Sequence, residues 1–144
     1  VSATKWLSQI ELTRWDDFDG YWVERGWAKN GPMKITSRID VPSSGDRLPA
    51  GLVVLAGVAW APTVGISGVE VWLDSVGEWI PSELGDTVSG ETWVQWSVAV
   101  DAGPGTQVAR VRAIDAGGTL QPEGPQPTFP DGAEGYHRIR FDTV

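Results

Sequence analysis

The sequence of 144 residues contains no cysteine and only one histidine, His137. Without cysteine the chain cannot form a disulfide, a thiolate metal site, an iron–sulfur cluster or a cysteine nucleophile. One histidine without cysteine also provides too few ligands for a typical zinc site. A Ser-His-Asp triad would have to use His137, but the sequence has no Gly-x-Ser-x-Gly motif to supply its serine. We therefore expect His137 to be a structural residue within a strand.

Positive charge is scarce as well. Lysine and arginine number 11 against 19 aspartate and glutamate residues, which gives a formal net charge of -8. This charge repels a phosphate backbone and an anionic membrane surface, so we expect no nucleic-acid partner. The longest apolar run, residues 52–61, is about half of what a bilayer crossing needs, so we expect no membrane insertion. The N-terminus lacks the features of a signal peptide, and Val1-Ser2-Ala3-Thr4 reads as a cut through a longer chain.

Helical periodicity is absent too, whereas alternation with a period of two recurs from residue 33 onward. About seven segments between turn-forming clusters read as strands, namely residues 34–41, 52–60, 69–73, 77–81, 93–100, 106–114 and 136–141. Residues 52–60 are almost continuously apolar, which indicates a central strand covered on both faces. This pattern predicts an all-β, Ig-like β-sandwich. The expected core includes Val54, Val58, Val71, Val94, Trp96, Val98, Val111 and Ile139.

Tryptophan is the residue that the chain has in excess. Four of the nine tryptophans, Trp6, Trp15, Trp22 and Trp27, lie in residues 1–32. This segment shows no periodicity apart from a short strand expected at 7–12. An irregular segment can bury only part of so many indoles against one small module, so a second surface should cover the rest. We therefore divide the chain into an aromatic N-terminal segment, 1–32, and a sandwich domain, 33–144.

Three other functions compete with this interpretation. The acidic stretch Asp16–Gly20 fails the spacing of a calcium-binding EF-hand, because the first and last ligand positions would fall on Trp15 and Gly26, and a solvated turn explains it better. A self-contained hydrolase would need a carboxylate pair, which 19 acidic residues supply by chance. The main alternative is a carbohydrate-binding sandwich whose platform would consist of Trp15, Trp22, Trp27, Trp72 and Trp79.

A series of short motifs runs in order along almost the whole chain. The first half contains Lys5-Trp6-Leu7, Ile10-Glu11-Leu12, Gly20-Tyr21-Trp22, Arg25-Gly26, Gly31-Pro32 and Ser37-Arg38-Ile39. The remainder contains Gly57-Val58-Ala59-Trp60, Gly68-Val69-Glu70-Val71, Trp93-Val94-Gln95-Trp96, Arg112-Ala113-Ile114-Asp115, Gln121-Pro122 and Gly135-Tyr136-His137-Arg138. In their order and spacing these motifs resemble the C-terminal dimerisation domain of sulfite-oxidase-like, molybdopterin-dependent oxidoreductases.

The resemblance implies a non-catalytic, Ig-like module of the E-set type that pairs two copies of an enzyme and braces its cofactor domain. In that family an upstream α+β domain holds the molybdenum–molybdopterin cofactor through a cysteine thiolate. We therefore expect no cofactor in this chain, and we expect two partners, the upstream domain and a second copy. Tyr136 stands where the family's motif usually has tryptophan, which suggests a bacterial branch.

The resemblance also implies roles for particular residues. In the family, the arginine after the histidine near the C-terminus reaches across the domain boundary and helps to form the anion pocket over the molybdenum. Arg138 occupies this position, and a guanidinium suits it because it stays charged and binds an oxyanion through two parallel hydrogen bonds. The alternative is a surface arginine paired with one of the surplus carboxylates. Contacts to the upstream domain or to a second copy are expected from Trp15, Tyr21, Trp22, Arg25 and Trp27.

Overall fold

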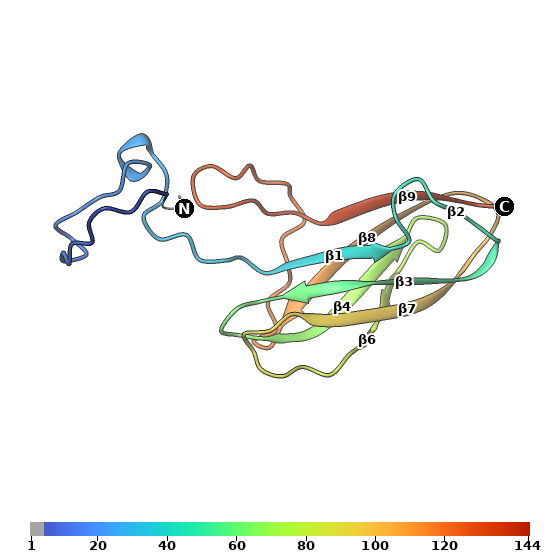
Figure 1. Cartoon of the computed structure of the whole chain (residues 1–144). Helices are drawn as coiled ribbons and strands as arrows, with labels where there is room; N and C mark the ends of the chain where they lie inside the picture. The colour runs from blue at the N-terminus through green and yellow to red at the C-terminus, as the bar shows by residue number, and fades with distance from the viewer. Residues whose placement is uncertain (1–4) are drawn as a thin grey trace.

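The structure is a computed structural model that describes residues 5–144; the expected cut at residues 1–4 lies outside this range. It is a sandwich of two β-sheets with an N-terminal segment that leads away from one end (Figure 1). One sheet has the strand order β1 (Thr36–Val41), β3 (Gly51–Trp60), β7 (Val94–Ala102) and β6 (Glu83–Leu84). The other has the order β2 (Arg47–Leu48), β9 (His137–Thr143), β8 (Gly105–Asp115), β4 (Ile66–Leu73) and β5 (Trp79–Pro81).

The architecture confirms the all-β sandwich expected from the sequence. Each of the expected strands of the sandwich is present, and the sequence pattern missed only β2 and β6, which have two residues each. Two residues are too few to show alternation. The one helical element in residues 5–144 is a 3-10 turn, η1 (Val23–Arg25). No helix in this part of the chain has the length and apolar character needed to cross a membrane.

The core confirms most of the predicted inward residues and corrects two of them. Five of the eight are buried, namely Val71, Val94, Trp96, Val111 and Ile139, and Val98 is partly buried against them. Val54 and Val58 were expected in the core, but Val54 is 51% exposed and Val58 is half-buried. In β3 the inward positions are Val53, Leu55 and Ala59.

The expectation that both faces of β3 would be covered was therefore wrong. β3 lies between β1 and β7 in one sheet, and only its inner face meets the opposite sheet. The alternation of inward and outward positions could not be read from the sequence, because apolar residues occupy both faces of this strand. The result is a sandwich whose four-stranded sheet has an exposed apolar strip on its outer face.

Gly57 allows β1 and a core tryptophan to approach the middle of β3. A Cβ atom at this position would lie 1.9 Å from the backbone oxygen of Arg38 and 2.9 Å from the Trp96 ring. Neither atom belongs to a flexible side-chain end, so the backbone of β1 would have to move. Glycine is therefore required here for close packing and not for an unusual φ.

Gly57→Ala should lower the free energy of unfolding by about 1–3 kcal/mol, the usual cost of overpacking a core. Gly103→Ala is the matched control, because a Cβ at Gly103 meets no atom within 4 Å; its effect should stay within about 0.5 kcal/mol. Urea denaturation of both variants measures the difference. Equal stability of the two variants would contradict the packing assigned to Gly57.

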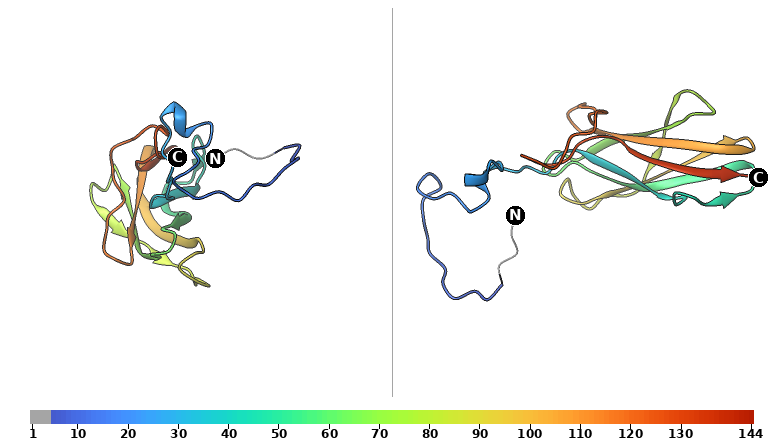
Figure 2. Two further views of the ribbon diagram at one scale, coloured as in Figure 1. Left: turned by 90° about the vertical axis from the view of Figure 1, so that its left-hand side faces the viewer. Right: turned by 90° about the horizontal axis from the view of Figure 1, so that it is seen from above.

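The N-terminal segment contains no strand between residues 5 and 32, so the strand expected at 7–12 was wrong. Leu7, Ile10 and Leu12 are exposed, and no neighbouring strand edge satisfies their backbone groups. The segment extends beyond the end of the sandwich at which β1 begins (Figure 2). The C-terminal part of the segment approaches the sandwich domain, where the amide of Ala28 donates a hydrogen bond to the carbonyl of Pro130 over 3.0 Å.

The long loop between β8 and β9 supports this segment and is itself tied to the sandwich by Gln121. The Gln121 side chain is buried, and its Oε1 accepts hydrogen bonds from the Ser37 hydroxyl (2.6 Å) and the Ala113 amide (3.1 Å). Its Nε2 donates to the carbonyl of Gly135 over 2.8 Å. Gln121 thus joins β1, β8 and the residues directly before β9, and it holds the loop at the end of the sandwich from which the N-terminal segment leaves.

Candidate interaction site at one end of the sandwich

The outer face of the five-stranded sheet carries a layer of aromatic and arginine side chains. Alternation turns Val71 and Val111 inward, so their neighbours in β4 and β8 face outward. Trp72 lies 5.7 Å from Trp79, and Trp79 lies 5.5 Å from Tyr136, measured between ring centroids. The guanidinium of Arg112 lies 4.0 Å from the Trp79 centroid.

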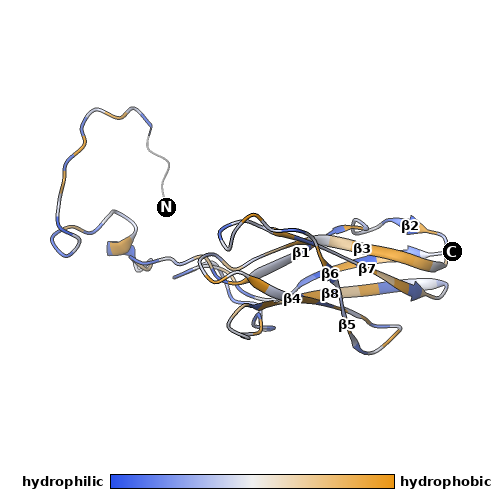
Figure 3. Ribbon diagram, turned by 90° about the horizontal axis from the view of Figure 1, so that it is seen from below, coloured by the Kyte–Doolittle hydropathy of each residue, from blue (hydrophilic) through white to orange (hydrophobic). Residues whose placement is uncertain are grey.

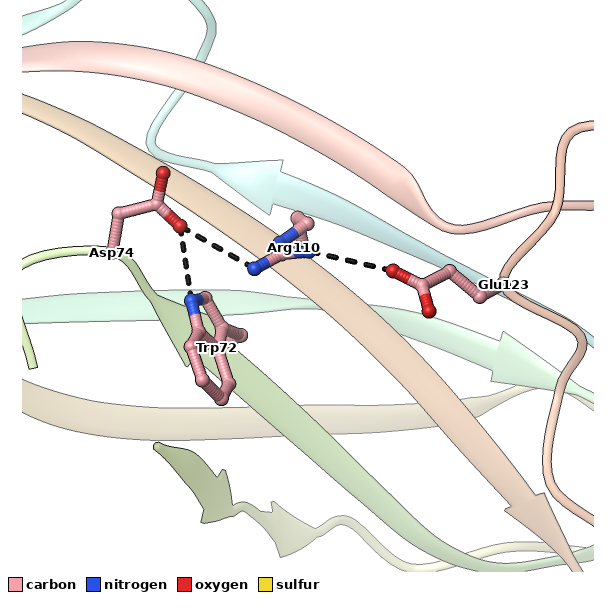
Figure 4. Close-up of polar contacts among 4 residues, drawn as sticks. All are labelled: Trp72, Asp74, Arg110 and Glu123. Carbon is pink, nitrogen blue, oxygen red and sulfur yellow. Dashed lines mark hydrogen bonds and ion pairs between the residues drawn. The ribbon is translucent and has the colours of Figure 1, made fainter. Parts of the chain in front are cut away.

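Carboxylates hold the arginines of this layer in place. Arg112 forms an ion pair with Glu70 at 2.6 Å. Burial lowers the pKa of Arg112, but hydrogen bonds to Glu70 and Tyr136 outweigh it and raise the pKa above its ordinary value. Arg110 contacts Asp74 at 3.5 Å and Glu123 at 3.4 Å, and the indole of Trp72 donates to the same carboxylate of Asp74 over 2.9 Å (Figure 4).

This layer does not provide the flat platform that the carbohydrate-binding alternative requires. The planes of Trp72 and Trp79 are inclined by 63°, and each indole has a guanidinium beside it. The other three tryptophans of that alternative lie in the N-terminal segment and do not join this pair. The structure thus does not bring the five residues together.

Arg138 lies on the same outer face, in β9, directly opposite Arg110 of β8. It is exposed, and its side chain forms no hydrogen bond or ion pair with any residue of the described range 5–144. The neighbouring inward positions are Ile139 and Phe141, as the alternation predicted. Two like charges placed directly opposite each other repel. Arg138 is thus a cation without a carboxylate partner, and an anion from outside the described chain would relieve this repulsion.

His137 has the structural role expected from the sequence. Its Nδ1 accepts a hydrogen bond from the amide of Ile39 over 3.1 Å, which joins β9 to β1 across the sandwich. Burial lowers the pKa of His137, Arg38 adds to this effect, and Asp40 opposes it. Only the neutral ring can accept this hydrogen bond, because both nitrogens of the protonated ring are donors.

Protonation of His137 should therefore destabilise the fold. Since its pKa in the folded chain lies below the ordinary value of 6.5, the unfolded chain binds the proton more readily. The free energy of unfolding should fall as the pH drops from about 7.5 through the histidine range. His137→Asn keeps an acceptor and has no titratable group, so denaturation of this variant should show a weaker pH dependence above about pH 5.5. Identical pH profiles for the two proteins would contradict this role.

The N-terminal segment brings three of its predicted contact residues together around η1. Tyr21 and Trp22 pack edge to face with centroids 5.0 Å apart, and the Arg25 guanidinium lies 3.4 Å from the Tyr21 ring centroid. Gly26, with φ of +91°, ends η1, and Trp27 then packs on Phe129 of the long loop at 5.3 Å. The three grouped side chains remain largely exposed.

Trp15 lies apart from this group and is held by Lys29. The Lys29 ammonium lies 4.9 Å from the Trp15 ring centroid and donates to the carbonyls of Trp15 and Phe18. It also pairs with Asp19 at 2.6 Å, so one residue of the acidic stretch is occupied by a lysine. Lys29 thus stabilises a turn around the acidic stretch, and the carboxylates of that stretch are not brought together around a common point.

Residues 15–32 should exchange their amide hydrogens faster than β7 in a monomeric sample, because they lack a strand ladder. Hydrogen exchange followed by mass spectrometry measures both segments in one experiment. Residues 94–100 serve as the internal control, because β7 pairs with β3 along its length. Equal protection of the two segments in a strictly monomeric sample would contradict this prediction.

Sequence reasoning missed a further group of aromatic residues at the end of the sandwich where β1 begins. Trp60 and Trp93 have ring centroids 6.0 Å apart, and Arg38 lies 5.7 Å from the Trp93 centroid. A signal existed for Trp93: it directly precedes Val94, which faces inward, so alternation turns Trp93 outward. No such signal existed for Phe129, because it lies in a loop without periodicity. The turns at the opposite end, residues 42–50 and 103–104, contain no aromatic residue.

The side chains of the described range 5–144 do not fit a molybdenum–molybdopterin centre held through a thiolate, or another metal site. The sequence has no thiolate donor, and Nδ1 of its one histidine already accepts the Ile39 amide. Residues 5–144 contain no group of three or more histidine, aspartate or glutamate side chains placed to hold a metal ion.

The fold is similar to that of several solved structures. The sulfane dehydrogenase SoxCD from Paracoccus pantotrophus matches 63% of this chain with 26% identity and a TM-score of 0.57. Fibronectin(III)-like modules of CbhA from Clostridium thermocellum match 75% with 17% identity and a TM-score of 0.50, and 96% of that module is covered. An endo-β-1,4-mannanase from Thermotoga petrophila matches 78% with 10% identity and a TM-score of 0.51.

The chain spans only 24% of the SoxCD chain and 20% of the mannanase chain. No protein-family model and no curated protein sequence matches it. The likeness to CbhA and the mannanase concerns the fold alone, and it shows an Ig- and fibronectin-like sandwich. The likeness to SoxCD also links the sandwich to part of an oxidoreductase.

Proposed function

We propose that this chain is a non-catalytic assembly domain of a sulfite-oxidase-like, molybdopterin-dependent oxidoreductase. In this role it braces an upstream molybdenum-cofactor domain and pairs two copies of the enzyme. The observation that carries the proposal is the concentration of exposed aromatic residues at the end of the sandwich where β1 begins. A second observation is Arg138, an arginine without a carboxylate partner on the outer face of the five-stranded sheet. The likeness to part of a sulfane dehydrogenase supports it.

The geometry suits a contact between two domains. The N-terminal segment and the loop that supports it lie at the end of the sandwich where β1 and β7 begin (Figure 1), and this end also carries Trp93 and Phe129. A domain joined to the segment would therefore meet this end first. Exposed indole and phenyl groups bury large apolar areas at such a contact. Arg138 adds a positive charge on the outer face of the five-stranded sheet. The side chains present fit a recognition role.

The coding sequence upstream of Val1 tests the proposal. It should encode an α+β domain with one cysteine positioned to bind molybdenum, continuous in frame with this chain. A glycosidase domain at that position would support the carbohydrate-binding alternative instead. A stop codon directly upstream would contradict any role that depends on an upstream domain.

A further inference from the structure

In the half of the four-stranded sheet nearer the C-terminus, only β3 and β7 remain. β1 pairs with β3 no further than Ala56, and β6 pairs with β7 only at Trp96 and Ser97. Beyond these residues β3 and β7 continue together to the Gly51–Ala102 pair (Figure 3). Residues 42–50, which connect β1 to β3 through β2, lie on the β3 side of this ladder. Its other side is an open edge along β7.

The backbone polar groups of Ala99 and Asp101 point toward this open edge. The carbonyl of Gln95 accepts a hydrogen bond from the amide of Gly85, so the backbone of Gln95 faces the β6 side and not β3. Alternation along the strand gives Ala99 and Asp101 the same direction. No hydrogen bond reaches the backbone of either residue from elsewhere in residues 5–144. Two amides and two carbonyls are thus available to a further strand, as is typical of an uncovered sheet edge.

Apolar and acidic side chains flank the open edge on the outer face of the sheet. Ala99 is exposed and lies opposite Val54, and Asp101 lies opposite Leu52, which is 78% exposed. Asp101 and Glu83 of β6 are also exposed, and neither carboxylate has an ion-pair partner within the described range 5–144. A strand that fits this edge therefore brings positive charge to Asp101 and apolar surface to Ala99.

The inner side of the same edge adjoins the core. Val98 of β7 and Ile80 of β5 are only partly buried against the core cluster. An added strand would cover them with its own inward side chains, which should be apolar. Its outward side chains should be lysine or arginine, because their aliphatic stems can lie on Ala99 while their charged ends reach Asp101. The edge thus fits a segment in which apolar and cationic residues alternate.

Charge distinguishes the possible occupants of this edge. The chain has a formal net charge of -8, and Asp101 and Glu83 add unpaired negative charge beside the edge, so a second copy would be repelled. The upstream domain proposed above would meet the other end of the sandwich, from which the N-terminal segment leaves (Figure 2). The charges therefore favour a cationic segment of a different protein.

We propose that the open edge of β7 binds an extended, cationic segment of a partner protein as an additional strand. This strand lies antiparallel to β7 and in line with β6, which pairs with β7 in the same orientation. Main-chain hydrogen bonds to Ala99 and Asp101 supply affinity, and the alternate side chains supply specificity. The partner is additional to the assembly role proposed above, and the proposal does not depend on that role.

A peptide of about seven residues in which lysine and valine alternate tests the proposal by calorimetric titration of the 144-residue chain. It should bind with a Kd on the order of 100 µM. In an antiparallel pair with outward lysines, the lysine amides face β7 and the valine amides face away. Methylation of the lysine amides should therefore weaken binding at least tenfold, whereas methylation of the valine amides should leave it unchanged.

A peptide that alternates glutamate with valine is the control for charge and should not bind. Binding that survives methylation of the lysine amides would overturn strand addition. Equal binding of the glutamate peptide would overturn the cationic partner, and failure of the lysine peptide to bind would overturn the whole proposal.

Two variants of the chain locate the site. Asp101→Lys should weaken binding of the lysine peptide at least tenfold, because it replaces an attraction by a repulsion. Asp86→Lys is the matched control: Asp86 is exposed after the end of β6, and its replacement changes the net charge equally but should leave Kd within about twofold. Ala99→Pro should abolish binding, because it removes an amide from the open edge and leaves the hydrogen bonds to β3 in place.

Amide hydrogen exchange followed by NMR provides a readout that an unspecific charge contact would not move. The amides of Ala99 and Asp101 should exchange at least tenfold more slowly when the lysine peptide is bound, because they then donate to it. The amides of Val98 and Val100 face β3 and serve as internal controls. Unchanged exchange at Ala99 and Asp101 with peptide bound would overturn the site. A dimer of the free chain that Ala99→Pro dissociates would assign the edge to a second copy and overturn the cationic partner.

Discussion

Arg138→Gln in the proposed full-length oxidoreductase is expected to lower kcat/KM for an anionic substrate at least tenfold, which corresponds to about 1.4 kcal/mol. Arg138 stands on the outer face of β9 opposite another arginine and has no carboxylate partner in residues 5–144. Its charge is thus available to an anion bound at the domain boundary. Glutamine keeps much of the side-chain length and some hydrogen-bonding capacity but removes the charge and the two parallel donors.

Arg140→Gln is the matched control for this prediction. Arg140 lies two residues further along β9 on the same face, away from the aromatic end, and it pairs in register with Val108. Its replacement should leave kcat/KM within about twofold of the wild-type value. Both variants should keep their fold and cofactor content. If Arg138→Gln also left kcat/KM unchanged, Arg138 would be an ordinary surface residue.

Phe141→Ala is expected to cost about 3–5 kcal/mol of folding free energy. Phe141 is fully buried in β9 and is the largest of the completely enclosed side chains. Its removal leaves a cavity that the two rigid sheets cannot close. A loss of this size is a large part of the roughly 5–15 kcal/mol that stabilise a domain.

Phe18→Ala provides the comparison, because Phe18 is exposed in the N-terminal segment. It should change the free energy of unfolding by no more than about 0.5 kcal/mol. Guanidinium denaturation of the two variants measures both effects. If Phe141→Ala cost less than about 1 kcal/mol, the position of Phe141 in the core would be wrong.

The sequence predicted the sandwich well wherever polar and apolar residues alternate. In β4, β8 and β9 the alternation of Val71, Val111 and Ile139 with charged or aromatic neighbours identified the inward face correctly. In β3 the alternation was hidden, because both faces carry apolar residues, and Val54 was placed in the core by mistake. The outward apolar residues of β3 form the exposed strip on the outer face of the four-stranded sheet, and only the structure reveals this strip.

The candidate site could be predicted only in part, because it depends on contacts between distant segments. The outward position of Arg138 followed from alternation, but the absence of a carboxylate beside it depends on how β8 and β9 pair. The packing of Trp27 on Phe129 joins residues about a hundred positions apart, and no periodicity signals it. Local patterns identify the face of a strand, whereas register and loop packing decide which side chains meet.

The molybdenum content of purified protein tests the central claim most directly. Mass spectrometry of the metal should find about one molybdenum atom per chain in the full-length gene product and none in the 144-residue chain, whose donor set has no thiolate. This result would place the chain beside a cofactor domain and outside the catalytic centre. Stoichiometric molybdenum in the 144-residue chain, or none in the full-length product, would contradict the account.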